Sequence, residues 1–115
     1  MARSRAAFDR FILSLPAATL SEQWGCSCAK VGGKVFALHH LADAGTVFKV
    51  GETSFEVLTG TDGIGQAPYF AKGQWVRVAK GALPDRDLRA YIVQSQALVV
   101  RKLTRKARAD LGLAD

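Results

Sequence analysis

Hydrophobic residues near the N-terminus recur with the spacing of a helix. Four apolar side chains between Phe8 and Leu15 occupy positions i, i+3, i+4 and i+7, and charged residues lie between or before them. This period predicts an amphipathic helix over residues 3–15. Pro16 follows directly and is expected to end it.

The next part of the chain changes to runs that are typical of strands. Residues 21–31 and 34–41 flank the pair Gly32-Gly33. Two adjacent glycines favour a tight hairpin turn, because both can adopt a positive φ. Residues 46–50 form a third strand-like run. We therefore expect three consecutive strands here.

A short helix and a second hairpin are expected further along. Residues 52–58 suit a short helix that ends before Gly60. Residues 60–67 contain three glycines and no hydrophobic period, so they are interpreted as a loop. Residues 68–71 and 74–80 are then interpreted as two strands around a Lys72-Gly73 turn.

The C-terminal third has the pattern of one long helix. Pro84 suits its start, acidic residues follow in the first turn, and the helix is expected to end near Gly112. Its buried stripe is predicted to contain Leu88, Ile92, Val99 and Leu103. Short connections make the sheet mainly antiparallel, with helices on one face. The sequence thus predicts a two-layer α+β fold, with residues 1–115 as one domain.

Composition narrows the class of protein. The chain has 115 residues, of which 49% are apolar and 23% charged, as in an ordinary globular protein. Nothing approaches the ~18 consecutive apolar residues of a membrane span. The basic N-terminus leads into an amphipathic stretch, unlike a signal peptide. Two cysteines without a secretory signal suggest free thiols. We expect a cytoplasmic protein with no membrane partner.

The positive charge is concentrated in the C-terminal third. Residues 1–73 hold seven Lys or Arg against six Asp or Glu, whereas residues 74–115 hold nine against four. The net charge of +6 favours a polyanionic partner. A solvated helix surface that keeps the protein soluble explains the same excess.

Several segments together resemble one known family. They are Leu15-Pro16, Lys30–Leu38, Val47–Val50, Trp75–Val78, Leu83–Asp85 and Leu98–Leu103. In this order, they resemble the MmcQ/YjbR family over nearly the whole chain. The resemblance implies a CyaY-like fold, the architecture shared with frataxin, and the family's usual description as DNA-binding proteins.

The resemblance has one clear departure. Family members often carry a stretch like Met-Asn-Lys-x-His-Trp, whereas this chain has Phe-Ala-Lys-Gly-Gln-Trp over residues 70–75. Lys72 and Trp75 match, but the Asn and His are absent. Iron handling of the frataxin kind would require an acidic ridge. The first predicted helix has a single acid, Asp9, among three arginines, so that activity is not expected.

Two groups of residues are candidates for contact with nucleic acid. The hairpin supplies Lys72, Gln74, Trp75, Arg77 and Lys80, and the helix supplies Arg101, Lys102, Arg105, Lys106 and Arg108. The hairpin cations lie around the aromatic residues Tyr69 and Trp75. Cations bind phosphates, and an exposed ring can lie near a groove. Trp75 by itself is better interpreted as a core residue, because Trp is mostly buried. Arg101, Arg105 and Arg108 share one face of a continuous helix, either as a phosphate stripe or as a solvated surface that complements the helix dipole.

The sequence gives little support for metal binding, catalysis or a phosphate-binding loop. If Gly32-Gly33 is a simple two-residue turn, Cys26 lies opposite His39, and Cys28 joins them on one face while His40 points away. These three lack a fourth ligand, so we expect no metal and no cofactor. No third group orients a Cys–His couple for catalysis. Residues 60–65 lack the context of a phosphate-binding loop.

The sequence therefore favours a non-enzymatic protein that binds DNA with low sequence specificity, through the basic hairpin and the basic C-terminal helix. One alternative is a protein-interaction module whose basic face meets an acidic partner. Another is a domain that binds a small molecule or metal near Cys26 and His39. The oligomeric state stays open.

Overall fold

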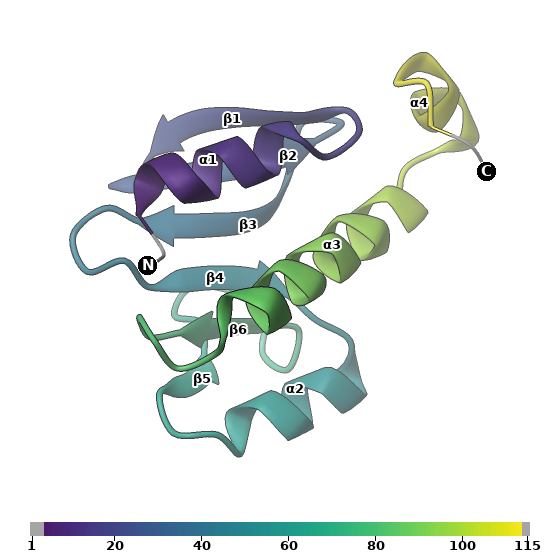
Figure 1. Cartoon of the computed structure of the whole chain (residues 1–115). Coiled ribbons are helices and arrows are strands. Elements are labelled where there is room, and N and C mark those ends of the chain that lie inside the picture. The colour runs from purple at the N-terminus through teal and green to yellow at the C-terminus, as the bar shows by residue number, and fades with distance from the viewer. Residues whose placement is uncertain (1–3, 114–115) are drawn as a thin grey trace.

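A computed structural model describes residues 4–113, which form helices and the strands of a sheet (Figure 1). In chain order they are α1 (Arg5–Leu13), β1 (Ala18–Gln23), β2 (Cys26–Val31), β3 (Lys34–His40), β4 (Thr46–Lys49), α2 (Glu52–Thr59), β5 (Ile64–Gln66), β6 (Trp75–Val78), α3 (Asp85–Arg101) and α4 (Arg105–Asp110). The first predicted helical residue, Arg3, lies outside the described residues. None of the described helices is long and apolar enough to cross a membrane.

All six strands form one antiparallel sheet in the order β1-β2-β3-β4-β6-β5. Helices α1 and α3 lie across the same face of this sheet, with α2 beside the β5 edge (Figure 1). The two-layer α+β prediction is confirmed. The sequence predicted five strands. The run over residues 21–31 belongs to two strands, β1 and β2, and the predicted strand over residues 68–71 is absent while β5 is present.

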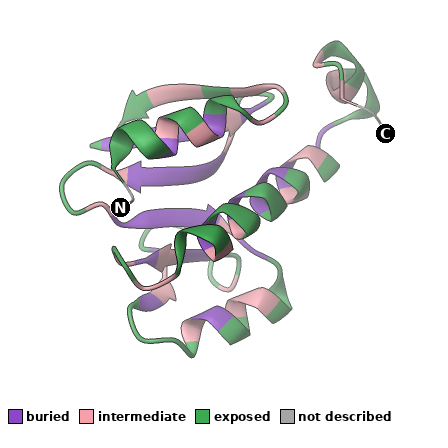
Figure 2. Ribbon diagram, in the orientation of Figure 1, coloured by how far each residue is buried: buried purple, intermediate pink, exposed green. Residues whose placement is uncertain are grey.

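The main core lies between the sheet and the helices. Its largest fully buried side chains include Phe36 and Phe48 from the sheet, Ile12 from α1 and Ile92 from α3. In Figure 2, buried residues, drawn in purple, are concentrated in the strands that the helices cover. The predicted stripe is confirmed on α3 for Leu88, Ile92 and Val99, which are buried. Leu103 is also buried, but it lies beyond the end of α3.

Two tight turns organise the first three strands. Gly32 and Gly33 have φ values of 59° and 77°, which confirms the predicted glycine turn between β2 and β3. The unpredicted turn lies between β1 and β2, at Trp24 and Gly25, with φ values of 53° and 70°. Asn-Gly is the usual pair in such a turn, because asparagine tolerates a left-handed backbone far better than a bulky residue does. Because Trp is unusual at such a position, the sequence did not indicate a turn at Trp24-Gly25.

A β-bulge interrupts the pairing of β2 with β3. Lys30 lies opposite Val35, but the next partners are Ala29 and Ala37, so Phe36 is an extra residue on β3. Phe36 and Ala37 consequently both belong to the core under the helices. Beyond the bulge, the register differs by one residue from that of a simple hairpin.

The partner of β6 is not the segment predicted from the sequence. Strand β5, over Ile64–Gln66, lies inside the predicted loop, and residues 68–71 are not a strand. The side chain of Gln66 holds the connecting segment in place. Its Nε2 donates to the carbonyl of Ala67 at 2.8 Å, and its Oε1 accepts from the backbone N–H of Gly73 at 3.0 Å.

The C-terminal helix is two helices. Helix α3 ends at Arg101, Leu103 is buried in the link, and Thr104 caps α4 by accepting from the N–H of Ala107 at 3.0 Å. The chain changes direction at the buried Leu103, and the Thr104 hydroxyl then caps the first turn of a new helix. The prediction of one continuous helix is therefore wrong over residues 102–104.

Candidate functional site

A second apolar cluster covers the open face of the sheet, which carries no helix within residues 4–113. It contains Cys26, Cys28, Leu38, Val47, Ala67 and Trp75. The connecting segment of residues 67–74, which we call the cover segment, contributes Ala67 to this cluster and packs against it through Phe70. Val35 of β3 packs against the cluster as well.

A groove crosses the open face between the β1–β2 turn and the cover segment. Its volume is about 560 Å³, and apolar side chains such as Leu38 and Val47 form its lining. Trp24 and Tyr69 also line it and are largely in solvent, with Trp24 73% exposed and Tyr69 fully exposed. Both have a left-handed backbone, with φ values of 53° and 70°. Such a conformation is rare for bulky residues.

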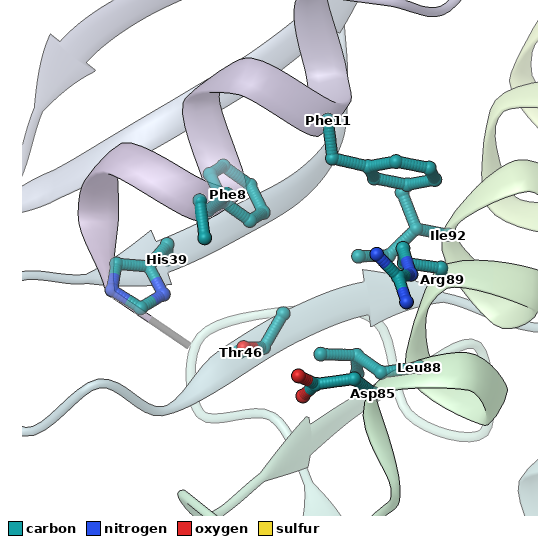
Figure 3. Close-up of a pocket in the computed structure, with 9 residues that line it drawn as sticks. Phe8, Phe11, His39, Thr46, Asp85, Leu88, Arg89 and Ile92 are labelled. Carbon is teal, nitrogen blue, oxygen red and sulfur yellow. The ribbon is translucent and has the colours of Figure 1, made fainter. Parts of the chain in front are cut away.

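The bulge places the histidines differently from the prediction. Cys26 lies opposite His40, and the Cys26 Sγ is 3.4 Å from the His40 Nδ1. His39 lies on the helix side and stacks on Phe8, with ring centroids 5.3 Å apart (Figure 3). The predicted cluster of Cys26, Cys28 and His39 is therefore wrong. Among the described residues, no three His, Cys, Asp or Glu side chains gather as a metal site.

The two thiols lie in an apolar setting. Burial raises the pKa of the Cys26 thiol, and the neighbouring Cys28 adds to the effect. Burial likewise raises the pKa of the Cys28 thiol. Because the thiolate is the reactive form, this environment favours inert thiols.

A small pocket lies under α1 and the start of α3 (Figure 3). It is lined by Phe8, Phe11, His39, Thr46 and Arg89, among others, and has a volume of about 60 Å³. One water occupies roughly 30 Å³ of liquid. The pocket is therefore too small for a typical organic ligand.

Three lysines from separate elements lie around a depression beside the C-terminal end of β4. Lys49 ends β4, Lys72 belongs to the cover segment, and Lys102 follows α3. They line one shallow depression of about 570 Å³. We call these residues the lysine cluster. It brings together one predicted hairpin cation and one predicted helix cation.

Lys49 contacts two neighbouring side chains within this cluster. Its Nζ donates to the Oε1 of Gln74 at 3.2 Å and lies 5.4 Å from the centre of the Trp75 ring. Partial burial lowers the pKa of Lys49, and the positive charge of Lys102 lowers it further. An anion placed here would offset both costs. Glu52 and Glu56 also line the depression, from α2.

Of the other predicted hairpin residues, Gln74 also lines this depression, whereas Trp75, Arg77 and Lys80 do not. Trp75 is buried and packs on Phe70, with ring centroids 4.5 Å apart, so its interpretation as a core residue is the better one. Arg77 lies on the open face and forms an ion pair with Asp43. Lys80 follows the other end of β6 from Lys72.

The predicted basic stripe of the C-terminal helix is also divided. Arg101 ends α3 and is exposed, whereas Arg105 lies beyond the break, in α4. Arg108 donates to the carbonyl of Leu103 at 2.6 Å, and Lys106 pairs with Asp110 at 3.2 Å. Because the helix axis is interrupted, the i, i+4, i+7 argument for one face does not apply.

Sequence reasoning missed Lys49 and Trp24, and it identified Tyr69 only as an aromatic ring near the hairpin cations. The Trp24-Gly25 pair was a possible turn signal inside the run of residues 21–31. Lys49 gave a weaker signal, as a cation at the end of an apolar strand. Nothing local indicated that Tyr69 is exposed.

Fold and surface together define the class: a basic two-layer α+β domain with an open sheet face and a lysine cluster at one end. The chain belongs to the YjbR family, whose model matches residues 13–98. This confirms the family resemblance identified in the sequence.

Two solved structures are similar to this one. A crystal structure of the Deinococcus radiodurans protein DR2400, described with domain DUF419, is 23% identical, with a TM-score of 0.86 over 98% of this chain and 91% of that one. A protein from Pseudomonas syringae is 18% identical, with a TM-score of 0.70 over 83% of this chain and 97% of that one. At these identities the likeness concerns the fold. No curated protein matches the sequence significantly.

Proposed function

We propose that the protein binds DNA non-covalently, with the lysine cluster as its phosphate-binding site. The observation that carries this proposal is the convergence of Lys49, Lys72 and Lys102 on one depression. The predicted hairpin contributes Lys72 to this surface, and the predicted C-terminal helix contributes Lys102.

Physical chemistry favours an anionic ligand at this surface. Burial of Lys49 and repulsion between Lys49 and Lys102 destabilise the charged form of Lys49, which is why its pKa is lowered. A bound phosphate would add an attractive interaction with both lysines and so offset this repulsion. Contacts of lysines with phosphate do not read bases, so binding of low sequence specificity is expected.

The test measures duplex binding as a function of salt. Fluorescence anisotropy with a labelled short duplex should give a slope of log K against log salt of about −3, if each of the three lysines neutralises one phosphate. The double variant Lys72→Glu, Lys102→Glu should weaken binding about tenfold or more at low salt and flatten that slope by about 2. Unrelated duplex sequences should give the same result.

A matched control separates the site from overall charge. Arg10→Glu with Arg86→Glu makes the same change in net charge at exposed positions on α1 and at the other end of α3 from Lys102. This control should retain nearly all affinity. Equal loss in both double variants would contradict a localised site, and absence of duplex binding by the wild type at low salt would refute the proposal. Circular dichroism checks that each variant is folded.

Glu52→Gln offers a test of opposite sign. Glu52 lines the depression from α2 and opposes a phosphate there. Removing its charge should strengthen duplex binding by a few-fold at low salt, because like charges in the site repel. Unchanged or weaker binding would contradict the assigned location.

A further inference from the structure

The groove on the open face carries two aromatic rings that the fold does not require. Trp24 and Tyr69 line it, yet both are exposed, and neither belongs to a core cluster. Their left-handed backbones add strain that a glycine or an asparagine would relieve. Strained, non-core residues cluster at functional sites. These two rings therefore point to a ligand.

The shape and chemistry of the groove indicate a flat, largely apolar group. Its volume of about 560 Å³ is in the range of small-molecule pockets, and its floor includes Leu38 and Val47. Arg77 and His40 add polar side chains at the lining. A nucleobase has this combination of an apolar face and a polar edge, and aromatic side chains bind bases by stacking.

The groove and the lysine cluster are separate hollows that a row of side-chain contacts connects. Lys49 contacts the Trp75 ring, the Trp75 ring packs on Phe70, and Phe70 lines the groove beside Tyr69. We expect a nucleic-acid strand that binds the lysines by its phosphates to extend along this row of side chains to the exposed rings. Bases inside a duplex are paired and stacked on one another, so only an unpaired base could enter.

We propose that this groove binds an unpaired base of single-stranded DNA, stacked on Trp24 or Tyr69. The proposal rests on the proposed DNA binding and specifies its substrate form. The strand would be held by its phosphates at the lysine cluster and by a base in the groove.

The experiment compares three labelled oligomers of equal length by fluorescence anisotropy: single-stranded oligo-dT, an abasic strand with the same phosphates, and a duplex. The wild type should prefer oligo-dT over the abasic strand. The double variant Trp24→Ala, Tyr69→Ala should lose about tenfold or more in affinity for oligo-dT, while its affinity for the abasic strand and for the duplex stays unchanged.

Two control variants test whether the effect depends on the aromatic rings: one keeps both rings, and the other lies on α2, away from the groove. Trp24→Phe with Tyr69→Phe keeps both rings and should retain the preference for oligo-dT. Val57→Ala removes an exposed apolar side chain from α2 and should change nothing. Trp24 fluorescence, measured in a Trp75→Phe background, should be quenched by oligo-dT and not by the abasic strand.

The outcomes distinguish the two proposals. If the lysine variants weaken all three oligomers but the aromatic variants change none, the groove proposal is overturned while the phosphate site stands. If the wild type binds oligo-dT no better than the abasic strand, the groove proposal is likewise overturned. If no oligomer binds at low salt, both proposals fail.

Discussion

The two faces of the sheet are built from the same strands but differ in how they are covered. The face under the helices is closed by large side chains such as Phe36, Phe48 and Ile92, which are fully buried. The open face has a smaller apolar cluster under the cover segment and places Trp24 and Tyr69 in solvent. Burial of apolar surface drives folding. The covered face therefore accounts for most of the stability, and the open face is free to carry residues that contribute little to it.

The largest expected effect lies on the covered face. Ile92 is 1% exposed, and Ile92→Ala should lower the free energy of unfolding by about 2–4 kcal/mol, because it leaves a cavity between α3 and the sheet. Chemical denaturation measures the loss. The neighbouring Val93 is 45% exposed, so Val93→Ala should change stability far less. Similar losses for both variants would contradict the assigned face of α3.

A smaller loss is expected where the link between α3 and α4 lies against the β2–β3 turn. At Gly32, with φ of 59°, an added Cβ would lie 3.0 Å from the Leu103 Cδ1. Gly32→Ala should lower the free energy of unfolding by roughly 1–2 kcal/mol through backbone strain and this contact. At Gly33, the added Cβ would meet nothing within 4 Å. Gly33→Ala should therefore cost less, and thermal melts that rank the two variants in the opposite order would contradict the packing of Leu103.

On the open face, one substitution should stabilise the protein. Trp24→Asn places a residue that tolerates a left-handed backbone in the β1–β2 turn, so the free energy of unfolding should rise by about 0.5–1 kcal/mol. The same variant should bind oligo-dT more weakly. Trp24→Ala, which keeps an unfavourable backbone, serves as the control and should show no such gain. A clear loss of stability in Trp24→Asn would mean that the ring packs more firmly than its exposure implies.

The smallest expected effect concerns the ion pair of Asp43 with Arg77. Hydrogen bonds from the Gly45 N–H and from Arg77 hold the pKa of Asp43 below its usual value. A lowered folded pKa stabilises the protein above the unfolded pKa of about 3.9, and the contribution is lost as the pH falls through the folded value. Asp43→Asn should thus cost less than about 1 kcal/mol at neutral pH, since the pair is exposed. Denaturation at acidic pH should show no difference, and a gap independent of pH would exclude the ion pair as its cause.

Periodicity was sufficient to predict the covered layer. The spacing of Leu88, Ile92 and Val99 identifies their shared face because the pattern and the packing have the same 3.6-residue period. The glycine turn at residues 32–33 was predictable for a local reason, since both positions need a positive φ. The helix break at residues 102–104 was missed because burial of Leu103 depends on its contact with Gly32, distant in sequence.

The candidate site was less predictable than the fold. Lys72 and Lys102 were identified as cations, but their meeting with Lys49 depends on how the cover segment and α3 are placed at one end of the sheet. The turn at Trp24 was hidden because its residue type argues against a left-handed backbone. Tyr69 was identified as a ring near the hairpin cations, but its exposure and its place at the groove depend on the fold of the cover segment.

The extra residue in β3 has a consequence for the comparison of related sequences. Phe36 shifts every later position of that strand by one place along the chain, while the partners beyond it remain Ala29 with Ala37 and Cys26 with His40. A relative without the bulge would therefore align correctly only with a one-residue gap at position 36. Without that gap, an alignment would superimpose groove residues such as Leu38 and His40 on residues of the buried layer, and substitution patterns at the groove would be assigned to the core.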